Sequence, residues 1–197
     1  MERLREVLAI VNDKGGVGKS TTAHNLACGL IKLNPETRVL IIDLDAQVAN
    51  VSLLCGWRER EDKHGTMYEA MVNKTAMPVY QVSVDEQDYH GNLYIAPSSE
   101  EMLSVEPFLL REINPNLELR GLLKVMVDKR TKASAGFSQH IDDEYGEYVF
   151  KTEIPRRTKI VEAQAMMQDI FTYAPECDAA KSYEAFAQEI VDTYTED

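Results

Sequence analysis

The chain alternates short apolar runs with longer segments whose apolar residues recur every three or four positions. Continuous apolar runs are typical of parallel strands covered on both faces, and the wider spacing is typical of helices. The runs predict five strands: Val7–Val11, Arg38–Asp43, Asn92–Pro97, Gly121–Val127 and Tyr148–Ile154. The spacing predicts helices at residues 19–33, 66–71, 100–113, 134–145, 159–167 and 181–194. Together they predict an α/β fold with a mostly parallel sheet flanked by helices.

Local signals support several of these boundaries. Asn34 and Pro35 end the first helix, because proline cannot continue a helix and restrains the residue before it. Thr66 followed by Glu69 has the spacing of a capping box at a helix start. The last helix carries one apolar stripe, which is formed by Tyr183, Phe186, Ala187, Ile190 and Tyr194.

A glycine-rich segment separates the first predicted strand from the first helix. Its residues are Lys14, Gly15, Gly16, Val17, Gly18, Lys19, Ser20 and Thr21. Glycines let backbone N–H groups approach phosphate oxygens closely, and the helix start adds further donors and the positive end of its dipole. Lys19 is placed for the β- and γ-phosphates, and Ser20 offers a hydroxyl to Mg²⁺. The alternative is a glycine-rich turn with two solvated lysines.

Two carboxylates, Asp43 and Asp45, follow the second predicted strand. Residues at the carboxyl end of a parallel strand point into the crevice where ligands bind. One carboxylate could hold Mg²⁺ through water and the other could orient a water molecule. Seen alone, the pair could also be two ordinary acids at a strand end, but the neighbouring phosphate loop favours the first interpretation.

Composition narrows the functional classes. The length of 197 residues, with 44% hydrophobic and 27% charged residues, predicts one globular domain over residues 1–197. A net charge of −12 disfavours general adhesion to nucleic acid or anionic lipid, although a local basic patch remains compatible with it. The acidic C-terminal end argues against a basic amphipathic membrane helix.

The cysteines and the absence of targeting signals predict a cytoplasmic protein without a membrane partner. Cys28, Cys55 and Cys177 lack metal-ligand spacing, and their odd number argues against a disulfide framework. We find no signal-peptide pattern and no apolar run of membrane-spanning length. The histidines are interpreted as structural or surface residues; they are His24, His64, His90 and His140.

Several segments resemble the ParA/Soj family of partition ATPases, within the wider ParA/MinD group. KGGVGKST resembles the group's deviant Walker A motif, which opens with a second lysine and lacks the common first glycine, here Asp13. VLIIDLDAQVANVSLLCG resembles the family's second motif, with Ala46 where proline is usual. Further matches are GTMYEAM, NLYIAPSS, INPNLELRGLLKVMVDKRT and VFKTEIPRRTKIVEA.

The resemblance covers residues 1–99 and 109–197, with a junction at about 100–108. Two central strands of the family, the first ending in a Walker B motif, have no counterpart in this chain. We therefore expect a three-layer P-loop NTPase-like fold with a reduced number of strands. We expect the Val7–Val11 and Arg38–Asp43 strands to pair directly and the sheet to close with five strands.

The resemblance implies an ATP-binding and ATP-hydrolysing protein of plasmid or chromosome partition. Lys14 would reach ATP bound in the partner subunit of a homodimer, while Lys19 and Ser20 would hold phosphates and Mg²⁺ in their own subunit. Asp45 would orient the attacking water, with Asp43 nearer the metal. The residues implied for nucleotide binding are Gly15, Gly16, Val17, Gly18, Lys19, Ser20, Thr21 and Pro155, the last near the adenine.

The resemblance also implies non-specific DNA binding by the ATP dimer, association with the nucleoid, and a ParB-like partner that stimulates hydrolysis. The candidate DNA contacts are Lys124, Lys129, Arg130, Lys132, Arg156, Arg157 and Lys159. Solvated surface charges are the alternative for these residues. A different functional class is a nucleotide-binding scaffold that holds ATP without turnover, since the missing Walker B motif removes a carboxylate from the metal site.

Overall fold

The computed structural model describes residues 7–11, 16–45, 50–57, 65–82, 89, 91–99, 101–102, 121–128 and 132–195. The helices are α1 (Lys19–Leu33), α2 (Asn50–Leu54), α3 (Met67–Asn73), α5 (Lys132–Tyr145), α6 (Thr158–Ala165), α7 (Ile170–Tyr173) and α8 (Asp178–Thr195). The strands are β1 (Val39–Ile42), β2 (Tyr80–Gln81), β3 (Leu93–Ala96), β4 (Leu122–Val127) and β5 (Val149–Pro155). A 3₁₀ turn, Gly146–Tyr148, precedes β5.

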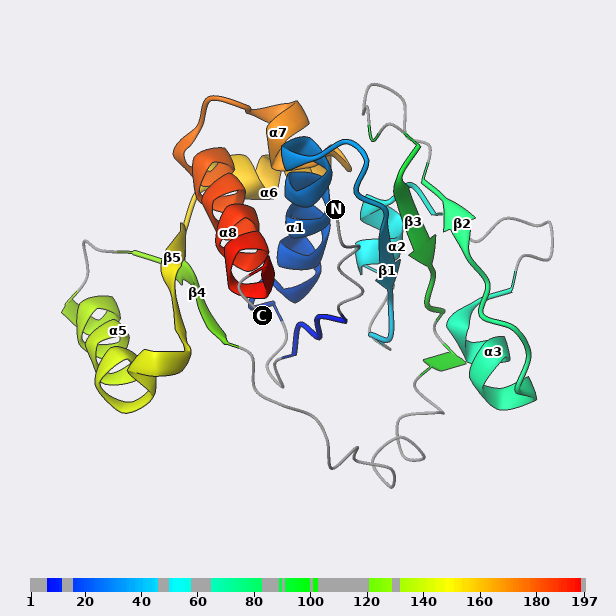
Figure 1. Cartoon of the computed structure of the whole chain (residues 1–197), viewed down its shortest axis with the longest axis horizontal. Helices are drawn as coiled ribbons and strands as arrows, with labels where there is room; N and C mark the ends of the chain where they lie inside the picture. The colour runs from blue at the N-terminus through cyan, green and yellow to red at the C-terminus, as the bar shows by residue number, and fades with distance from the viewer. Residues whose placement is uncertain are drawn as a thin grey trace.

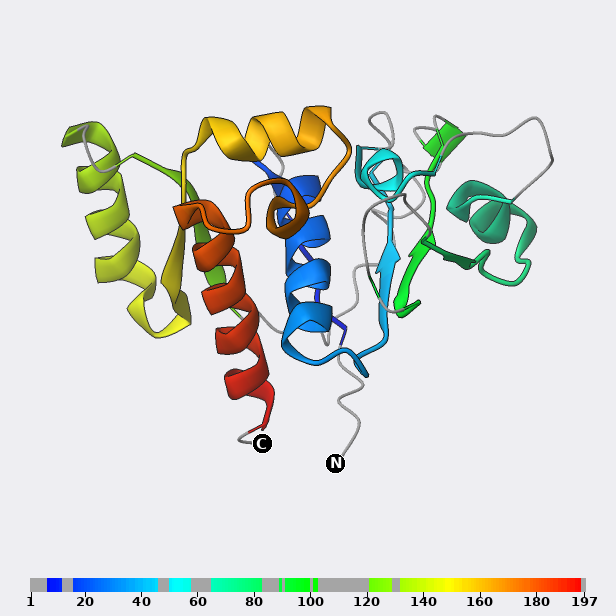
Figure 2. The same cartoon turned by 90° about the horizontal axis from the view of Figure 1, so that it is seen from above.

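The described strands form two separate sheets. The first has the order β1-β3-β2, with β1 parallel to β3 and the short β2 antiparallel to it. The second is the parallel pair β4-β5. Helix α1 lies between the two sheets, with α8 beside it on the side of β5 (Figures 1 and 2). The fold is therefore α/β with parallel strands flanked by helices, as predicted.

The prediction of a first strand at Val7–Val11 is wrong. Residues 7–11 do not form a strand, and the side chains of Val7 and Val11 are 88% and 78% exposed. The predicted pairing of Val7–Val11 with Arg38–Asp43 in one five-stranded sheet is wrong as well, because β1 pairs with β3 and the strands divide into two sheets. An apolar run becomes a strand only when neighbouring edges satisfy its N–H and C=O groups.

Two further strand expectations need correction. β1 is not covered on both faces, since Leu40 and Ile42 are exposed while Ile41 between them is buried. The short strand β2 was not among the five predicted strands. Two residues suffice there because β2 adds to the edge of the existing strand β3.

Most predicted helices are confirmed. α1 has the predicted bounds, and the backbone N–H of Asn34 bonds back to the carbonyl of Leu30 at its end. The capping box is present: the Thr66 N–H donates to Glu69 Oε2 over 2.7 Å. The predicted helix at 100–113 lies outside the described residues apart from 101–102. Within the described part of the chain, no helix is long and apolar enough to cross a bilayer.

Two cores meet at α1. On one side Leu26 joins the buried stripe of α8, which confirms the predicted positions Tyr183, Phe186, Ala187 and Ile190; the side chain of Tyr194 is outside the described set. On the other side Ala27, Cys28 and Ile31 pack on β1 and β3. The phosphate-loop helix is therefore held between both sheets, which fixes the orientation of its first turn.

A side chain of α8 binds the backbone of β5. The carboxylate of Glu189 accepts hydrogen bonds from the backbone N–H groups of Lys151, over 2.7 Å, and Thr152, over 3.0 Å. Both donors lie between Val149 and Glu153, where the pairing of β5 with β4 shifts register. A helix side chain thus satisfies two consecutive N–H groups in an irregular stretch of the strand.

Candidate functional site

The glycine loop has the backbone geometry expected before a phosphate-binding helix. Gly16 and Gly18 have φ values of 72° and 92°, in the left-handed region that side chains disfavour. Gly18 is the N-cap of α1, and its carbonyl accepts the N–H of Thr22 over 2.8 Å. Lys19 and Ser20, in the first turn, are half-buried, and Thr21 is buried. Lys14 and Gly15 lie outside the described residues.

The start of α1 suits an anion. Gly18 supplies no side-chain cap for the N–H groups of the first turn. The first turn also contains no acidic residue, so no carboxylate competes with an incoming phosphate. Uncapped N–H donors, the helix dipole and the Lys19 side chain together fit a phosphate group. The Ser20 hydroxyl is a suitable oxygen donor for Mg²⁺.

The two predicted carboxylates lie at the same end of the molecule as this loop. α1 and β1 run in opposite directions, so the first turn of α1 and the end of β1 lie at the same end of the pair (Figure 1). Asp43 follows β1 and is only 3% exposed, whereas Asp45 is half-buried. The structure thus brings the phosphate loop and the acid pair to one end, as the sequence predicts for a parallel strand.

Both oxygens of Asp43 are already engaged. Oδ1 accepts the N–H of Asp45 over 3.1 Å, and Oδ2 accepts the hydroxyl of Ser52 over 2.6 Å and its N–H over 3.2 Å. Burial raises the pKa of Asp43, against the lowering effect of the hydrogen bonds from Ser52 and Asp45. A metal ion at Asp43 would therefore share oxygens that three protein donors already use.

Sequence reasoning missed Ser52 and Ser98 as parts of this site. Ser52 is in α2 and Ser98 follows β3, and both are buried. The Ser98 hydroxyl donates to the carbonyl of Asp45 over 2.9 Å, and its N–H donates to Ser52 Oγ over 3.2 Å. The one available signal was that both segments match the same family as the loop.

Pro155 and three of the basic candidates, Arg156, Arg157 and Lys159, lie at or after the end of β5. Pro155 is half-buried, and the N–H of Arg156 after it donates to the carbonyl of Val127 at the end of β4 over 3.0 Å. Arg157 forms an ion pair with Asp178 at 2.5 Å, and Lys159 forms one with Glu162 at 2.8 Å. Lys129 and Arg130, and the side chain of Lys132, lie outside the described set.

Lys124 is held inside the β4–β5 unit. Its side chain is 11% exposed, and its ammonium lies 2.9 Å from carboxylate oxygens of both Asp142 and Glu153. Two neighbouring carboxylates already neutralise this charge, so Lys124 is a poor partner for a DNA phosphate. The structure therefore assigns it to linking α5 with the sheet.

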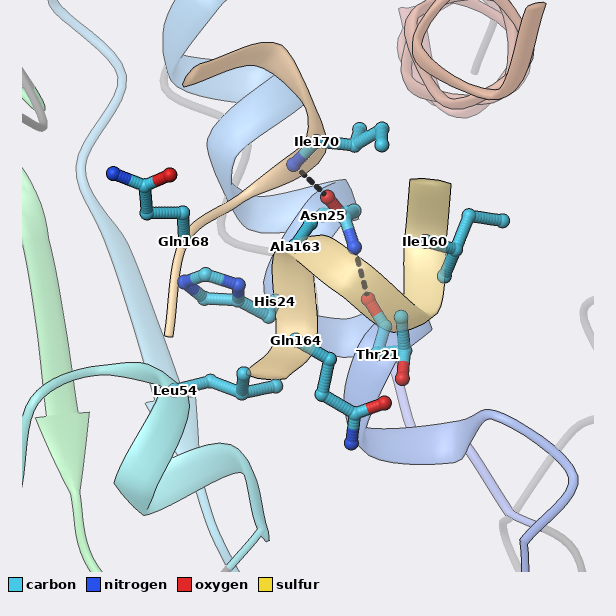
Figure 3. Close-up of a pocket in the computed structure, with 9 residues that line it drawn as sticks. All are labelled: Thr21, His24, Asn25, Leu54, Ile160, Ala163, Gln164, Gln168 and Ile170. Carbon is cyan, nitrogen blue, oxygen red and sulfur yellow. Dashed lines mark hydrogen bonds between the residues drawn. The ribbon is translucent and has the colours of Figure 1, made fainter. Parts of the chain in front are cut away.

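A small pocket is lined by residues of α1, α2, α6 and the start of α7 (Figure 3). Asn25 joins two of these elements: its Nδ2 donates to the Thr21 carbonyl and its Oδ1 accepts the Ile170 N–H, each over 2.8 Å. His24 is fully buried, and neither ring nitrogen has a hydrogen-bond partner among the described residues. Burial lowers the pKa of His24 to about 4, against an opposing attraction from Asp169.

Comparisons with known proteins agree with this geometry. A family model described as an AAA domain matches residues 5–130. The chromosome-partitioning ATPase Soj of Thermus thermophilus is 28% identical over 237 positions, covering 93% of this chain and 94% of Soj. The chromosome partitioning protein ParA of Caulobacter vibrioides is 26% identical over 253 positions, covering 94% and 93%.

A solved structure shows the same fold. The Mg-ADP complex of the septum site-determining protein MinD from Pyrococcus horikoshii has a TM-score of 0.58 at 18% identity, covering 91% of this chain and 93% of MinD.

The alignments also agree with an internal gap. The alignment with Soj runs over 237 positions, more than the 197 residues of this chain can fill, although it spans nearly all of both proteins. The relatives therefore contain internal residues that this chain lacks. With the family match over most of its length and the relatives on both sides of the gap, the chain belongs to the AAA-domain family of ParA/MinD-type partition ATPases.

Proposed function

We propose that this chain binds ATP with Mg²⁺ at the loop before α1 and hydrolyses its terminal phosphoanhydride bond. The observation that carries the proposal is the pair of left-handed glycines, Gly16 and Gly18, directly before a 15-residue helix whose first turn holds Lys19 and Ser20. Such a helix start attracts phosphate groups. The MinD structure with Mg-ADP supports a nucleotide of this class.

Each residue has a specific task in the proposal. Lys19 and the N–H groups of the first turn neutralise and orient the phosphates, and Ser20 holds Mg²⁺ together with Asp43. When bound, Mg²⁺ neutralises negative charge on the phosphate oxygens. Asp45 orients the water for in-line attack. Phosphoryl transfer depends mainly on positioning and charge neutralisation, which this set of groups can supply.

A nucleotide-binding scaffold without turnover is the second candidate. Val7–Val11 is not part of a sheet, and β1 and β4 belong to different sheets. The chain also lacks internal residues that Soj contains, and its described strands form two sheets. A phosphate loop can bind nucleotide in this setting, whereas hydrolysis needs a more completely organised metal site.

Phosphate release at saturating ATP separates the two candidates. We expect the wild type to exceed Asp45→Ala by about a hundredfold, because the variant loses the group that orients water. Lys19→Ala is the control for binding and should fail to retain ATP in equilibrium dialysis. Equal background rates in wild type and Asp45→Ala, with ATP still bound, would favour the scaffold. Failure of the wild type to bind ATP would exclude both candidates.

We extend the proposal to a partition role through an ATP-dependent homodimer. Lys14 would contact ATP bound in the partner subunit, and Pro155 would lie near the adenine. A ParB-like partner would stimulate hydrolysis, and the dimer would associate with DNA on the nucleoid. The support is the naming of Soj and ParA as chromosome-partitioning proteins. Sedimentation velocity with and without ATP checks the dimer.

For DNA contact, the structure favours Arg156 among the candidate side chains that it describes. Arg156 is exposed and has no ion pair among the described residues, unlike Arg157 and Lys159. We expect Arg156→Ala to weaken retention of the ATP-bound protein on DNA. A salt series should show that the slope of log affinity against log salt concentration falls in magnitude by about one unit. Lys181→Ala removes an equal charge from exposed α8 and should leave the slope unchanged.

The same salt series tests DNA binding as a whole. Retention that depends on neither ATP nor salt would contradict the DNA role, and equal slopes for both variants would exclude Arg156 as the contact.

A further inference from the structure

Four hydrogen bonds form a closed ring around the backbone of Asp45. The Asp45 N–H donates to Asp43 Oδ1 over 3.1 Å, and Asp43 Oδ2 accepts the Ser52 hydroxyl over 2.6 Å. Ser52 Oγ accepts the N–H of Ser98 over 3.2 Å, and the Ser98 hydroxyl donates to the Asp45 carbonyl over 2.9 Å. The ring therefore grips Asp45 at both its N–H and its C=O.

The ring joins three separate segments. Asp43 and Asp45 follow β1, Ser52 is in α2, and Ser98 follows β3. Asp43, Ser52 and Ser98 are all at most 3% exposed. Hydrogen bonds in such a dry environment are stronger than in water, and a fully satisfied network holds a single arrangement. The end of β1 is thus fixed against both neighbouring elements.

A local turn does not explain this arrangement. The bond between the Asp43 carboxylate and the Asp45 N–H is a common aspartate turn and needs no distant residue. The carbonyl of Asp45, however, is bound by Ser98, which is 53 positions away in the chain. Ser98 is in turn held through Ser52, which also donates its own N–H to Asp43 over 3.2 Å.

We propose that Asp43, Ser52 and Ser98 are positioning residues that fix the backbone of Asp45 and so aim its carboxylate at the attacking water. This inference rests on the proposed role of Asp45 in hydrolysis. It gives Asp43 an action through Asp45 in addition to the metal contact proposed above. Ser98 is the best residue for a test, because it contacts Asp45 from the segment after β3 and is not one of the two acids.

The test combines two measurements on Ser98→Ala. Hydrogen exchange followed by NMR reports on the Asp45 amide without any turnover. We expect exchange of this amide to become about tenfold faster in Ser98→Ala, because its carbonyl side is released. With hydrolysis we expect kcat to fall about tenfold while KM for ATP changes by less than about twofold, since small displacements affect the transition state most.

Two further variants control for other effects. Ser99→Ala makes the same chemical change one position outside the ring and should leave both measurements as in the wild type. Ser98→Thr keeps the hydroxyl and should restore both. If Ser98→Ala does not fold, Ser52→Ala removes the opposite side of the ring and is subject to the same measurements.

The outcomes for the ring and for hydrolysis are distinguishable. Unchanged exchange of the Asp45 amide in Ser98→Ala and Ser52→Ala overturns the ring as a positioning device, whatever the rate of hydrolysis. Faster exchange in these variants but not in Ser99→Ala supports fixation of Asp45. If the wild type then shows no hydrolysis, the proposed enzymatic function fails while the fixed backbone of Asp45 stands. Faster exchange without any change in kcat overturns the catalytic purpose of the ring.

Discussion

Phe186→Ala is expected to lower the free energy of unfolding by about 3–5 kcal/mol. Phe186 is buried in the core between α8 and β5 and packs edge-to-face on Phe150, with ring centroids 5.1 Å apart at 74°. The substitution removes this contact and leaves a cavity beside α1. Urea denaturation monitored by circular dichroism measures the loss.

Val161→Ala is the control for this measurement. Val161 is apolar but 66% exposed on α6, so its truncation should change the free energy of unfolding by no more than about 0.5 kcal/mol. Similar losses for both variants would show that the core between α8 and β5 does not carry the stability assigned to it.

His24 is expected to make the folded protein less stable at acid pH. Its pKa is about 4 in the fold and 6.5 ordinarily, so the unfolded chain takes up a proton first as pH falls. The contribution of neutral His24 is complete above about pH 6.5 and is lost as pH falls to about 4, a total of about 3 kcal/mol. Asp169, the charged neighbour, reduces this effect by attracting the protonated ring.

Comparison of the wild type with His24→Leu separates the effect of the histidine on stability from the effects of other titrating groups. We expect the wild type to lose about 3 kcal/mol more than the variant between pH 6.5 and pH 4, since carboxylates common to both proteins cancel in the difference. Chemical denaturation at several pH values provides the two curves. Parallel curves would mean that a partner reaches the imidazole of His24 and stabilises its charged form.

Local signals predicted helices well because they act within one segment. The bounds of α1 follow from Gly18 before the helix and Asn34–Pro35 after it, and the capping box of α3 follows from Thr66 and Glu69. These interactions join residues three or four positions apart, so the sequence contains all the information they require. The buried stripe of α8 was predictable for the same reason.

Strands and the site depend on distant partners. Val7–Val11 has the composition of a buried strand, yet all of it except the half-buried Leu8 is exposed, and no described strand pairs with it. The glycine pattern and the position after a strand predicted the phosphate loop and the acid pair, and the family resemblance added the roles proposed for their side chains. No local pattern pointed to Ser52 and Ser98, because a buried serine that supports a backbone has no distinctive spacing, and the family match marked only the segments that contain them.

The contact between Glu189 and β5 ties the register of the second sheet to the docking of α8. The carboxylate binds two consecutive N–H groups in the stretch where the pairing of β5 with β4 shifts register. A change to regular pairing in this stretch would take donors away from the carboxylate, and a half-buried carboxylate without its partners is costly. α8 therefore favours the irregular register, so the strand pair and the helix are expected to reach their final arrangement together.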